Sequence, residues 1–286
     1  MYKIGNIIIK ITNLNPRNYS SRLELFRVGN GIIDAEFQIQ YINKFDIIQN
    51  AECIYKNSQF AVMVRDNRKL YCYMMNNYIY AVLEDPLFDN NIFKLYLEVS
   101  FFSENIHPYF LPSLLGIERL LIKKKSFVLH SSYIDLKNNG LLFTAPSGGG
   151  KSTQAELWKR YKNAIIVNGD KSIIGKKENQ WIASGLPFSG SSNDCKNITT
   201  PLRAIVILNK GTENYFQEVG IRGFSNLLSQ VTVNPWDKTF CSMAMNLVID
   251  VCNEVPIYYY SCTKTKEAVD VLYKEFIEKG ILNGTV

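Results

Sequence analysis

Apolar and polar residues alternate in short runs over the first hundred residues. The segments 60–66, 69–75 and 79–85 are rich in Val, Tyr and Ile, and Asn, Asp or Arg interrupts them. Alternation with a period of two, broken by turn residues, is typical of a meander of half-buried strands. The first eighteen residues alternate in the same way. We therefore expect residues 1–106 to form a strand-rich N-terminal region.

The pattern changes character near Pro112. Between residues 107 and 125 the Leu and Ile residues at 114, 115, 117, 120 and 121 follow an approximately helical stripe. This spacing predicts a helix after Pro112. We place the boundary of the second domain just before this segment, so that the domain covers residues 107–286.

Strand and helix patterns then alternate to the end of the chain. Strands are predicted at 127–136, 140–145, 164–170, 181–187, 201–208 and 257–262, and helices at 151–161, 224–231, 238–255 and 264–279. Such alternation indicates an α/β domain. The chain is therefore predicted to be an α/β domain preceded by a smaller strand-rich domain.

Composition and charge exclude several classes of protein. The chain has 286 residues and is 47% hydrophobic, with 17 Tyr and 16 Phe, which is enough for one or two cores and unlike a disordered chain. The net charge of +6 is mild, and the densest basic run, residues 123–125, is too short for a nucleic-acid surface. We expect no nucleic-acid partner.

Cysteine usage and hydropathy predict a location. The six Cys residues form no Cys-x-x-Cys pair and the chain has only two His, so a zinc site is not expected. The N-terminus lacks a small-residue cleavage site, and no apolar run is long enough to span a membrane. The prediction is a cytoplasmic protein with free thiols and no membrane partner. The oligomeric state stays open.

The most informative stretch is LLFTAPSGGGKSTQAELWKRY, residues 141–161. An apolar strand runs into three glycines and then into Lys-Ser and a helix. This is the arrangement of a phosphate-binding loop, in which backbone N–H groups and the helix N-terminus surround phosphate oxygens. The pattern usually opens with Gly, and Ala145 stands there instead. The other interpretation is a tight turn with a chance Lys-Ser.

The loop predicts binding of ATP with Mg²⁺. Lys151 would reach the β and γ phosphates and the Ser152 hydroxyl would hold Mg²⁺. The Asn-Lys at 209–210 lacks the carboxylate that a guanine-reading motif places two residues later, so a GTPase is not indicated. The predicted nucleotide-binding residues are Ser147, Gly148, Gly149, Gly150, Lys151, Ser152 and Thr153.

Two further side chains are candidates for catalysis. Asp170 ends the strand after the loop helix, where a carboxylate can face the γ-phosphate and the metal. His130 lies one strand before the loop. The alternatives are a turn-forming Asp and a structural His.

The segments 127–153 and 165–174 together resemble the catalytic domain of HPr kinase/phosphorylase. They are still more similar to the small HPr-kinase-like proteins of peptide-modification gene clusters, such as lasso-peptide kinases. His130, Asp135 five residues later, the glycine loop and Asp170 occur in the same order. The resemblance extends over residues 107 to 275 and implies a phosphoenolpyruvate-carboxykinase-like nucleotide domain. It also implies phosphate transfer from ATP to a serine hydroxyl.

The resemblance assigns roles to single residues. It places His130 beside the phosphate and makes Lys151 and Ser152 loop ligands, with Asp135 a mainly structural acid. HPr kinase has two adjacent acids where this chain has Gly169 and Asp170, so Asp170 is left as base, metal ligand or both. A Glu-x-Arg-Gly segment is absent, which argues against phosphorylase activity and against HPr as the substrate.

Substrate recognition is predicted from two segments. The polar loop at 185–197 is expected to cover the phosphate end, with Ser189, Ser191, Ser192 and Lys196 near the substrate; the alternative is a surface turn. In the N-terminal region, Tyr71, Tyr73, Tyr78 and Tyr80 either contact a substrate or only pack the sheet.

We therefore expect an ATP-dependent serine kinase of a peptide or protein. The alternatives are a small-molecule or sugar kinase, and a protein that binds nucleotide without catalysis.

Overall fold

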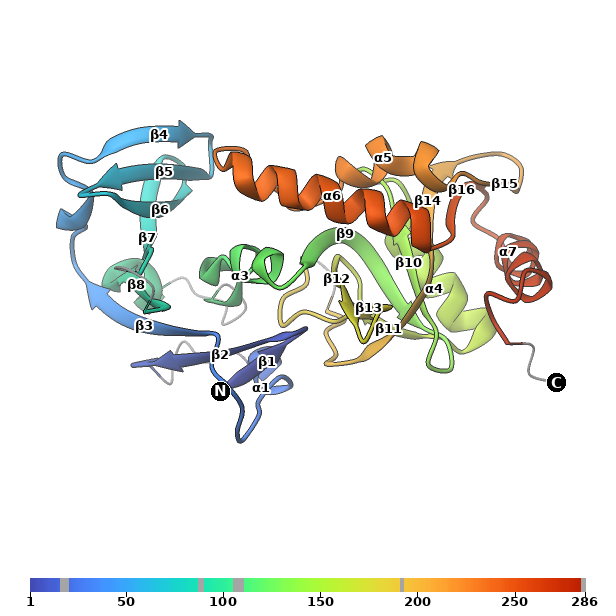
Figure 1. Cartoon of the computed structure of the whole chain (residues 1–286), viewed down its shortest axis with the longest axis horizontal. Coiled ribbons are helices and arrows are strands. Elements are labelled where there is room, and N and C mark those ends of the chain that lie inside the picture. Colours follow the sequence, from blue (N-terminus) through green and yellow to red (C-terminus); the bar gives the residue numbers. More distant parts are fainter. Residues whose placement is uncertain (16–20, 87–89, 105–110, 191–192, 284–286) are drawn as a thin grey trace. The chain divides into compact units, whose positions relative to one another are not determined.

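The structure is a computed structural model that describes residues 1–15, 21–86, 90–104, 111–190 and 193–283. The chain is a mixed α/β protein with two eight-stranded sheets. It divides into two compact units, residues 1–120 and 121–286, each with one sheet (Figure 1). The expected boundary at 106/107 lies fourteen residues before this division.

The first unit is built on a mixed sheet in the order β1-β2-β3-β8-β7-β6-β5-β4. Its strands are β1 (Tyr2–Ile4), β2 (Ile7–Thr12), β3 (Ala35–Ile42), β4 (Glu52–Lys56), β5 (Phe60–Arg65), β6 (Arg68–Met75), β7 (Tyr78–Glu84) and β8 (Ile92–Glu98). The predicted meander is confirmed as β5–β7. Its turns at 66–67 and 76–77 have positive φ at both positions, the geometry of tight hairpins, for which Asp and Asn are suited.

Short helices complete the first unit: α1 (Ser21–Glu24), η2 (Asp46–Ile48), α2 (Val99–Glu104), η3 (Leu111–Leu115) and α3 (Glu118–Lys123), of which α3 continues into the second unit. The single helix predicted after Pro112 is wrong. Gly116, with φ +54°, separates η3 from α3, and a Cβ there would lie 2.6 Å from the Arg119 guanidinium. Residues 107–110 lie outside the described residues.

The four tyrosines singled out in the first unit differ in their surroundings. Tyr71 is buried, and its hydroxyl donates a hydrogen bond to Asp85. The Arg119 guanidinium lies 3.6 Å from its ring centre, so this tyrosine belongs to the packed interior of the unit. Tyr73 and Tyr80 line a pocket of about 770 Å³, while Tyr78 is exposed. Tyr80 is buried and stacks on Phe101, so contact of these tyrosines with a substrate stays a prediction.

The second unit contains β9 (Ser126–Asp135), β10 (Gly140–Thr144), β11 (Ile165–Asn168), β12 (Lys171–Lys177), β13 (Gln180–Ser184), β14 (Thr199–Lys210), β15 (Tyr215–Glu218) and β16 (Ile257–Cys262). The pairings of β9, β12, β13, β14 and β10 close a ring. Strands β12 and β15 were not predicted. The core of β12, Ser172–Gly175, is buried between β9 and β13 although only Ile173 and Ile174 are apolar.

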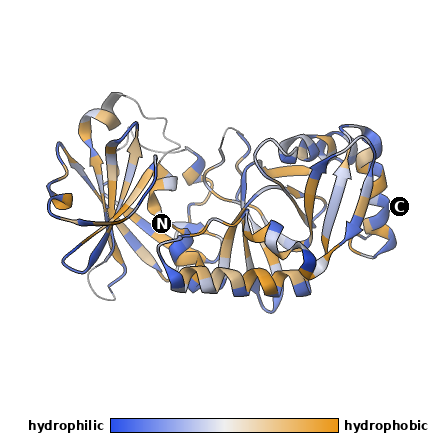
Figure 2. Cartoon of the chain, turned by 90° about the horizontal axis from the view of Figure 1, so that it is seen from above, coloured by the Kyte–Doolittle hydropathy of each residue, from blue (hydrophilic) through white to orange (hydrophobic). Residues whose placement is uncertain are grey.

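Helices cover both faces of the sheet around β10, β14 and β16. They are α4 (Lys151–Lys162), η4 (Gly220–Gly223), α5 (Phe224–Leu228), α6 (Lys238–Glu254) and α7 (Lys266–Glu278). Alternate strand residues serve the two layers: Leu142, Ile205 and Ile257 pack with α6, whereas Phe143, Val206 and Tyr258 pack with α4 and α7. Figure 2 shows α6 carrying hydrophobic and hydrophilic residues in turn, as an amphipathic helix does.

Candidate functional site

The glycine loop connects β10 to α4, as the sequence predicts. Gly148 has φ +74° and Gly150 has φ +99°, backbone conformations that side chains with a Cβ disfavour. Gly149 is confined differently, because a Cβ there would lie 2.5 Å from Ala145 Cβ. Each of the three glycines is therefore required by the shape of the loop. The N–H groups in the first turn of α4 have no partner within the helix and open onto this loop.

The Lys151 side chain is folded back over the loop. Its Nζ donates hydrogen bonds to the carbonyl oxygens of Ala145 (2.9 Å) and Pro146 (3.4 Å). Burial lowers the pKa of the Lys151 ammonium, and the Asp170 carboxylate opposes that shift. The cation and Asp170 are thus close enough to interact, although one follows β10 and the other follows β11.

The remaining loop residues present polar groups at the surface. Ser147, Gly148, Ser152 and Thr153 are exposed. The Ser152 hydroxyl lies 3.5 Å from the carbonyl oxygen of Gly169, the residue before Asp170. The start of α4 and the end of β11 therefore meet at this edge of the sheet.

Asp170 and His130 form a hydrogen-bonded pair. His130 Nε2 lies 3.0 Å from Asp170 Oδ1, and an ionised carboxylate can only accept, so Nε2 is the donor. This hydrogen bond is the main reason that the pKa of Asp170 lies below its ordinary value, and burial opposes it. The His130 and Asp170 side chains are 33% and 26% exposed, so both remain accessible to a ligand.

Asn168 holds Asp170 in place and was not predicted from the sequence. Its fully buried side chain accepts hydrogen bonds from the N–H groups of Asp170 and Lys171, both at 3.0 Å. Its amide nitrogen donates to the carbonyls of Leu186 and Phe188. The Asn-Gly pair at 168–169 is a turn signal, but a turn signal does not reveal the two long-range bonds.

Strand β9 braces the same turn. Ser131 donates its N–H to the Asp170 carbonyl, and the Ser132 hydroxyl donates to the Gly169 carbonyl, both at 2.9 Å. The Thr144 hydroxyl at the end of β10 donates to the His130 carbonyl. The pair is thus positioned by one backbone and two side-chain hydroxyl hydrogen bonds from two neighbouring strands.

The segment after β13 reaches Asp170 from the other side. The Gly190 N–H donates to Asp170 Oδ2 at 3.2 Å, and a Cβ at Gly190 would lie 3.0 Å from the carboxylate carbon. Ser189 is buried, and Ser191 and Ser192 lie outside the described residues. Lys196 Nζ donates to the Ile166 carbonyl at 2.7 Å and lies 3.9 Å from Asp194. The predicted place of Lys196 near the substrate stays a prediction.

Asp135 stands apart from the other candidates. It pairs with Gly140 and Ile165, at the end of β9 remote from the glycine loop. Burial raises the pKa of its carboxyl group. The structure therefore does not bring Asp135 to the site.

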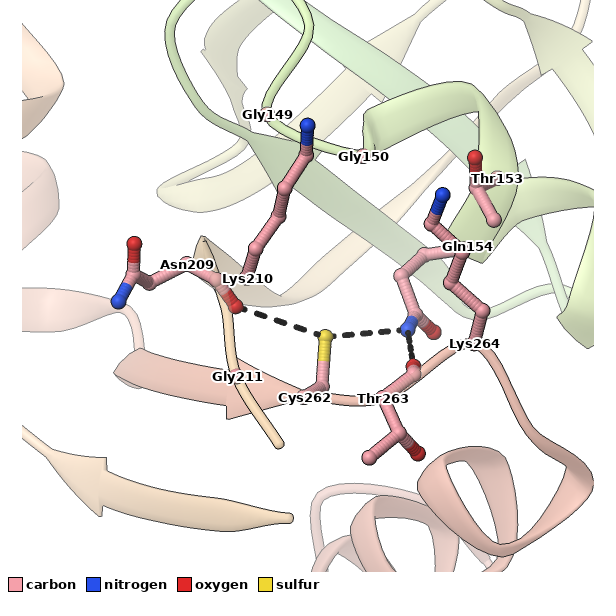
Figure 3. Close-up of a pocket in the computed structure, with 10 residues that line it drawn as sticks. All are labelled: Gly149, Gly150, Thr153, Gln154, Asn209, Lys210, Gly211, Cys262, Thr263 and Lys264. Atoms are coloured by element: carbon pink, nitrogen blue, oxygen red, sulfur yellow. Dashed lines mark hydrogen bonds between the residues drawn. The ribbon is translucent and has the colours of Figure 1, made fainter. Parts of the chain in front are cut away.

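A pocket of about 250 Å³ opens on the other side of the loop (Figure 3). It lies between Gly149 and Gly150, the first turn of α4, and the ends of β14 and β16. The sequence did not predict this pocket, whose lining residues also include Thr153, Gln154, Asn209, Lys210, Gly211, Cys262, Thr263 and Lys264.

The described residues also bear on metal binding and membrane crossing. They contain no group of three or more His, Cys, Asp or Glu side chains placed to share a metal ion. Within those same residues no helix has both the length and the apolar character to cross a membrane.

Comparison with known proteins finds a distant structural likeness. No family model matches the chain, and no curated protein does. Among solved structures, the chain is similar to the Hpr(Ser) kinase/phosphatase from Coxiella burnetii, with a TM-score of 0.32 and 14% identity. The match covers 54% of this chain and 97% of the other. A likeness of this degree does not assign an activity.

Proposed function

We propose that the protein is an ATP-dependent kinase that transfers the γ-phosphate to a hydroxyl group, with a serine of a ribosomal peptide or protein as the acceptor. One observation carries the proposal. The glycine loop with Lys151 and the His130-bound Asp170 meet at one edge of the sheet, where Ser152 lies 3.5 Å from the Gly169 carbonyl. A phosphate-binding loop beside an ionised carboxylate can hold the nucleotide and accept the proton of the attacking hydroxyl, as phosphoryl transfer requires.

The nucleotide domain is proposed to be a phosphoenolpyruvate-carboxykinase-like P-loop domain. In this proposal the loop N–H groups of residues 147–153 and the N-terminus of α4 bind the phosphates. Lys151 leaves the carbonyls of Ala145 and Pro146 and turns to the β and γ phosphates. The loop carbonyls hold its ammonium at the site until a nucleotide enters.

The residues present fit Mg²⁺. This ion takes oxygen ligands and is held through one or two carboxylates together with substrate phosphates and water. The exposed Ser152 hydroxyl and the Asp170 carboxylate are such donors, and both adjoin Gly169. When bound, the ion neutralises charge on the phosphates.

In this proposal Asp170 acts on the acceptor. Its lowered pKa keeps it ionised at neutral pH, so it can accept the hydroxyl proton while His130 fixes its orientation. As the acceptor oxygen bonds to the γ-phosphorus, the bond from that phosphorus to the β–γ bridging oxygen breaks. The products are the phosphorylated acceptor and ADP.

A peptide acceptor is supported by the sequence resemblance and by the first unit. That unit presents Tyr73, Tyr78 and Tyr80 at a pocket or at the surface. Large, rigid side chains with a polar tip are frequent contact residues. We propose that residues 1–120 help to recognise the acceptor.

The test is incubation of the protein with Mg-ATP and the peptides encoded beside its gene, followed by mass spectrometry. A phosphate mass gain on serine, absent with Asp170→Asn, supports the proposal. Phosphorylation of sugars or small alcohols in place of peptides points to the alternative kinase class. Tight ATP binding without transfer to any acceptor contradicts the proposed activity.

A further inference from the structure

The pocket in Figure 3 lies on the other side of β10 from the His130–Asp170 pair. Strand β10 has β9 on one side and β14 on the other. His130 comes from β9 and Asp170 is bonded to that strand, whereas the pocket lies at the ends of β14 and β16. A nucleotide with its phosphates in the loop and its γ-phosphate toward Asp170 would direct its other end to the pocket.

The location is one where ligands are expected. Strands β10, β14 and β16 are parallel, and their carboxyl ends carry the loop, Lys210 and Cys262. Open α/β sheets bind ligands beyond the carboxyl ends of their strands. A volume of about 250 Å³ has room for a small ring system.

Gln154 supplies an independent indication of a ligand. Only 2% of this residue is exposed, and its Nε2 donates to Cys262 Sγ at 3.1 Å and to the Thr263 carbonyl at 3.3 Å. Because a carbonyl can only accept, these bonds determine which end of the amide is nitrogen. The Oε1 atom is buried and has no hydrogen-bond partner. A buried acceptor without a donor is unfavourable, so this oxygen is suited to an incoming N–H group.

We propose that this pocket receives the adenine base of the nucleotide and that Gln154 Oε1 accepts a hydrogen bond from the adenine 6-amino group. The inference rests on the proposed function and adds the base site to it. The charged lining residues are Lys210 and Lys264, and Figure 3 shows Lys210 extending toward Gly149, where it adds positive charge beside the phosphates. An anion in the pocket would leave the Gln154 oxygen without a donor.

The first experiment separates base binding from phosphate binding. Calorimetry compares Mg-ATP with inorganic tripolyphosphate, which lacks the base. We expect the wild type to bind ATP about tenfold more tightly or better, the effect of one well-made hydrogen bond and its contacts. Thr153→Trp fills the pocket from an exposed helix position and should abolish this advantage, whereas Glu156→Trp, exposed on the same helix and outside the lining, should keep it.

The outcomes distinguish the base site from the proposed function. Equal affinities of the wild type for ATP and tripolyphosphate, or an unchanged advantage in Thr153→Trp, would overturn the base site and leave the phosphate loop standing. Binding of neither compound would remove the proposed function, and the base site with it.

A second experiment tests Gln154 itself. Purine riboside 5′-triphosphate lacks only the 6-amino group, and the wild type should bind it about tenfold more weakly than ATP. Gln154→Leu should bind both compounds equally. The proposal fails if the wild type does not distinguish the two. Thermal melting checks that the variant folds; if it does not, the wild-type comparison and the Thr153→Trp result decide.

Discussion

At the scale of single residues, the Asp170 carboxylate has charged and polar partners on several sides. Asp170 accepts from His130 Nε2 and from the Gly190 N–H, and Lys151 is buried close enough to interact with it. The backbone N–H groups of residues 170 and 171 converge on Asn168. The Asp170 carboxylate is therefore held in one orientation before any ligand binds.

Lys151→Ala should reduce phosphate transfer by roughly 10²–10³-fold and weaken ATP binding, because the site loses its buried phosphate-facing cation. Steady-state kinetics and calorimetry measure the two effects. Lys159→Ala, an exposed lysine two turns along α4 whose partner is Glu156, is the matched control and should behave like the wild type. Unchanged turnover in Lys151→Ala would remove this lysine from the site.

His130→Ala should shift the acid limb of the pH–rate profile upward. The His130 hydrogen bond is the leading cause of the lowered pKa of Asp170, so removing it raises that pKa and the carboxylate protonates at a higher pH. His130→Gln retains an N–H donor and should lie closer to the wild type. An acid limb of His130→Ala that coincides with that of the wild type would contradict this account.

The same pair has a consequence for stability. The pKa of Asp170 is lower in the folded protein than its ordinary value, so its contribution to stability is present at neutral pH. The contribution is lost as pH falls through the folded pKa. In His130→Ala the acid loss of stability should therefore be smaller, as chemical denaturation at a series of pH values would show.

At the scale of elements, the glycine loop illustrates how backbone geometry alone can demand a residue. Gly150 and Gly280 both have positive φ, +99° and +67°, and a Cβ at either would meet nothing within 4 Å. Substitution at these positions is therefore opposed by backbone strain and not by a clash. Gly150 begins α4 at the site, whereas Gly280 follows α7 far along the chain.

Gly150→Ala and Gly280→Ala should each lower the free energy of unfolding by about 1–2 kcal/mol, the cost of a left-handed conformation. Only Gly150→Ala should also weaken ATP binding, because its added methyl group stands in the phosphate cradle. Urea denaturation and calorimetry test the pair. If both variants bind ATP like the wild type, the loop does not approach the phosphates closely.

At the scale of the whole molecule, each unit has its own sheet and its own apolar core. Leu111, Leu114 and Leu115 of η3 are buried in the first unit, and Ile122 belongs to the core of the second. A fragment that begins near Glu118 therefore leaves out the buried leucines of η3, whereas a fragment that begins near residue 107 carries them.

A fragment of residues 118–286 should bind ATP like the full chain and should lose phosphorylation of its peptide if the first unit recognises the acceptor. A fragment of residues 107–286 should be less soluble, because it carries the leucines of η3 without the sheet that buries them. Light scattering, calorimetry and peptide kinetics measure the three properties. Unchanged peptide kinetics in fragment 118–286 would exclude the first unit from recognition.

Local chemistry explains which parts were predictable. The loop and α4 follow from glycines, an apolar strand before them and a helical pattern after them, all within residues 140–162. The helices α6 and α7 were predictable because their apolar residues recur at helical spacing. In contrast, β12 has only two apolar residues and is a strand because β9 and β13 pair with it on both sides. The interruption at Gly116 depends on the path of the Arg119 side chain.

The sequence by itself determined the candidate phosphate loop and its Lys151, because the backbone freedom of glycine and the register of a strand-to-helix turn are local properties. Only the tertiary structure decided what surrounds the loop. Asn168, which positions Asp170, is itself held by carbonyls 18 and 20 residues away, and Gln154 meets Cys262 across 108 positions of sequence. Such contacts depend on strand order and on which buried polar groups find partners, and no local pattern of residues specifies either.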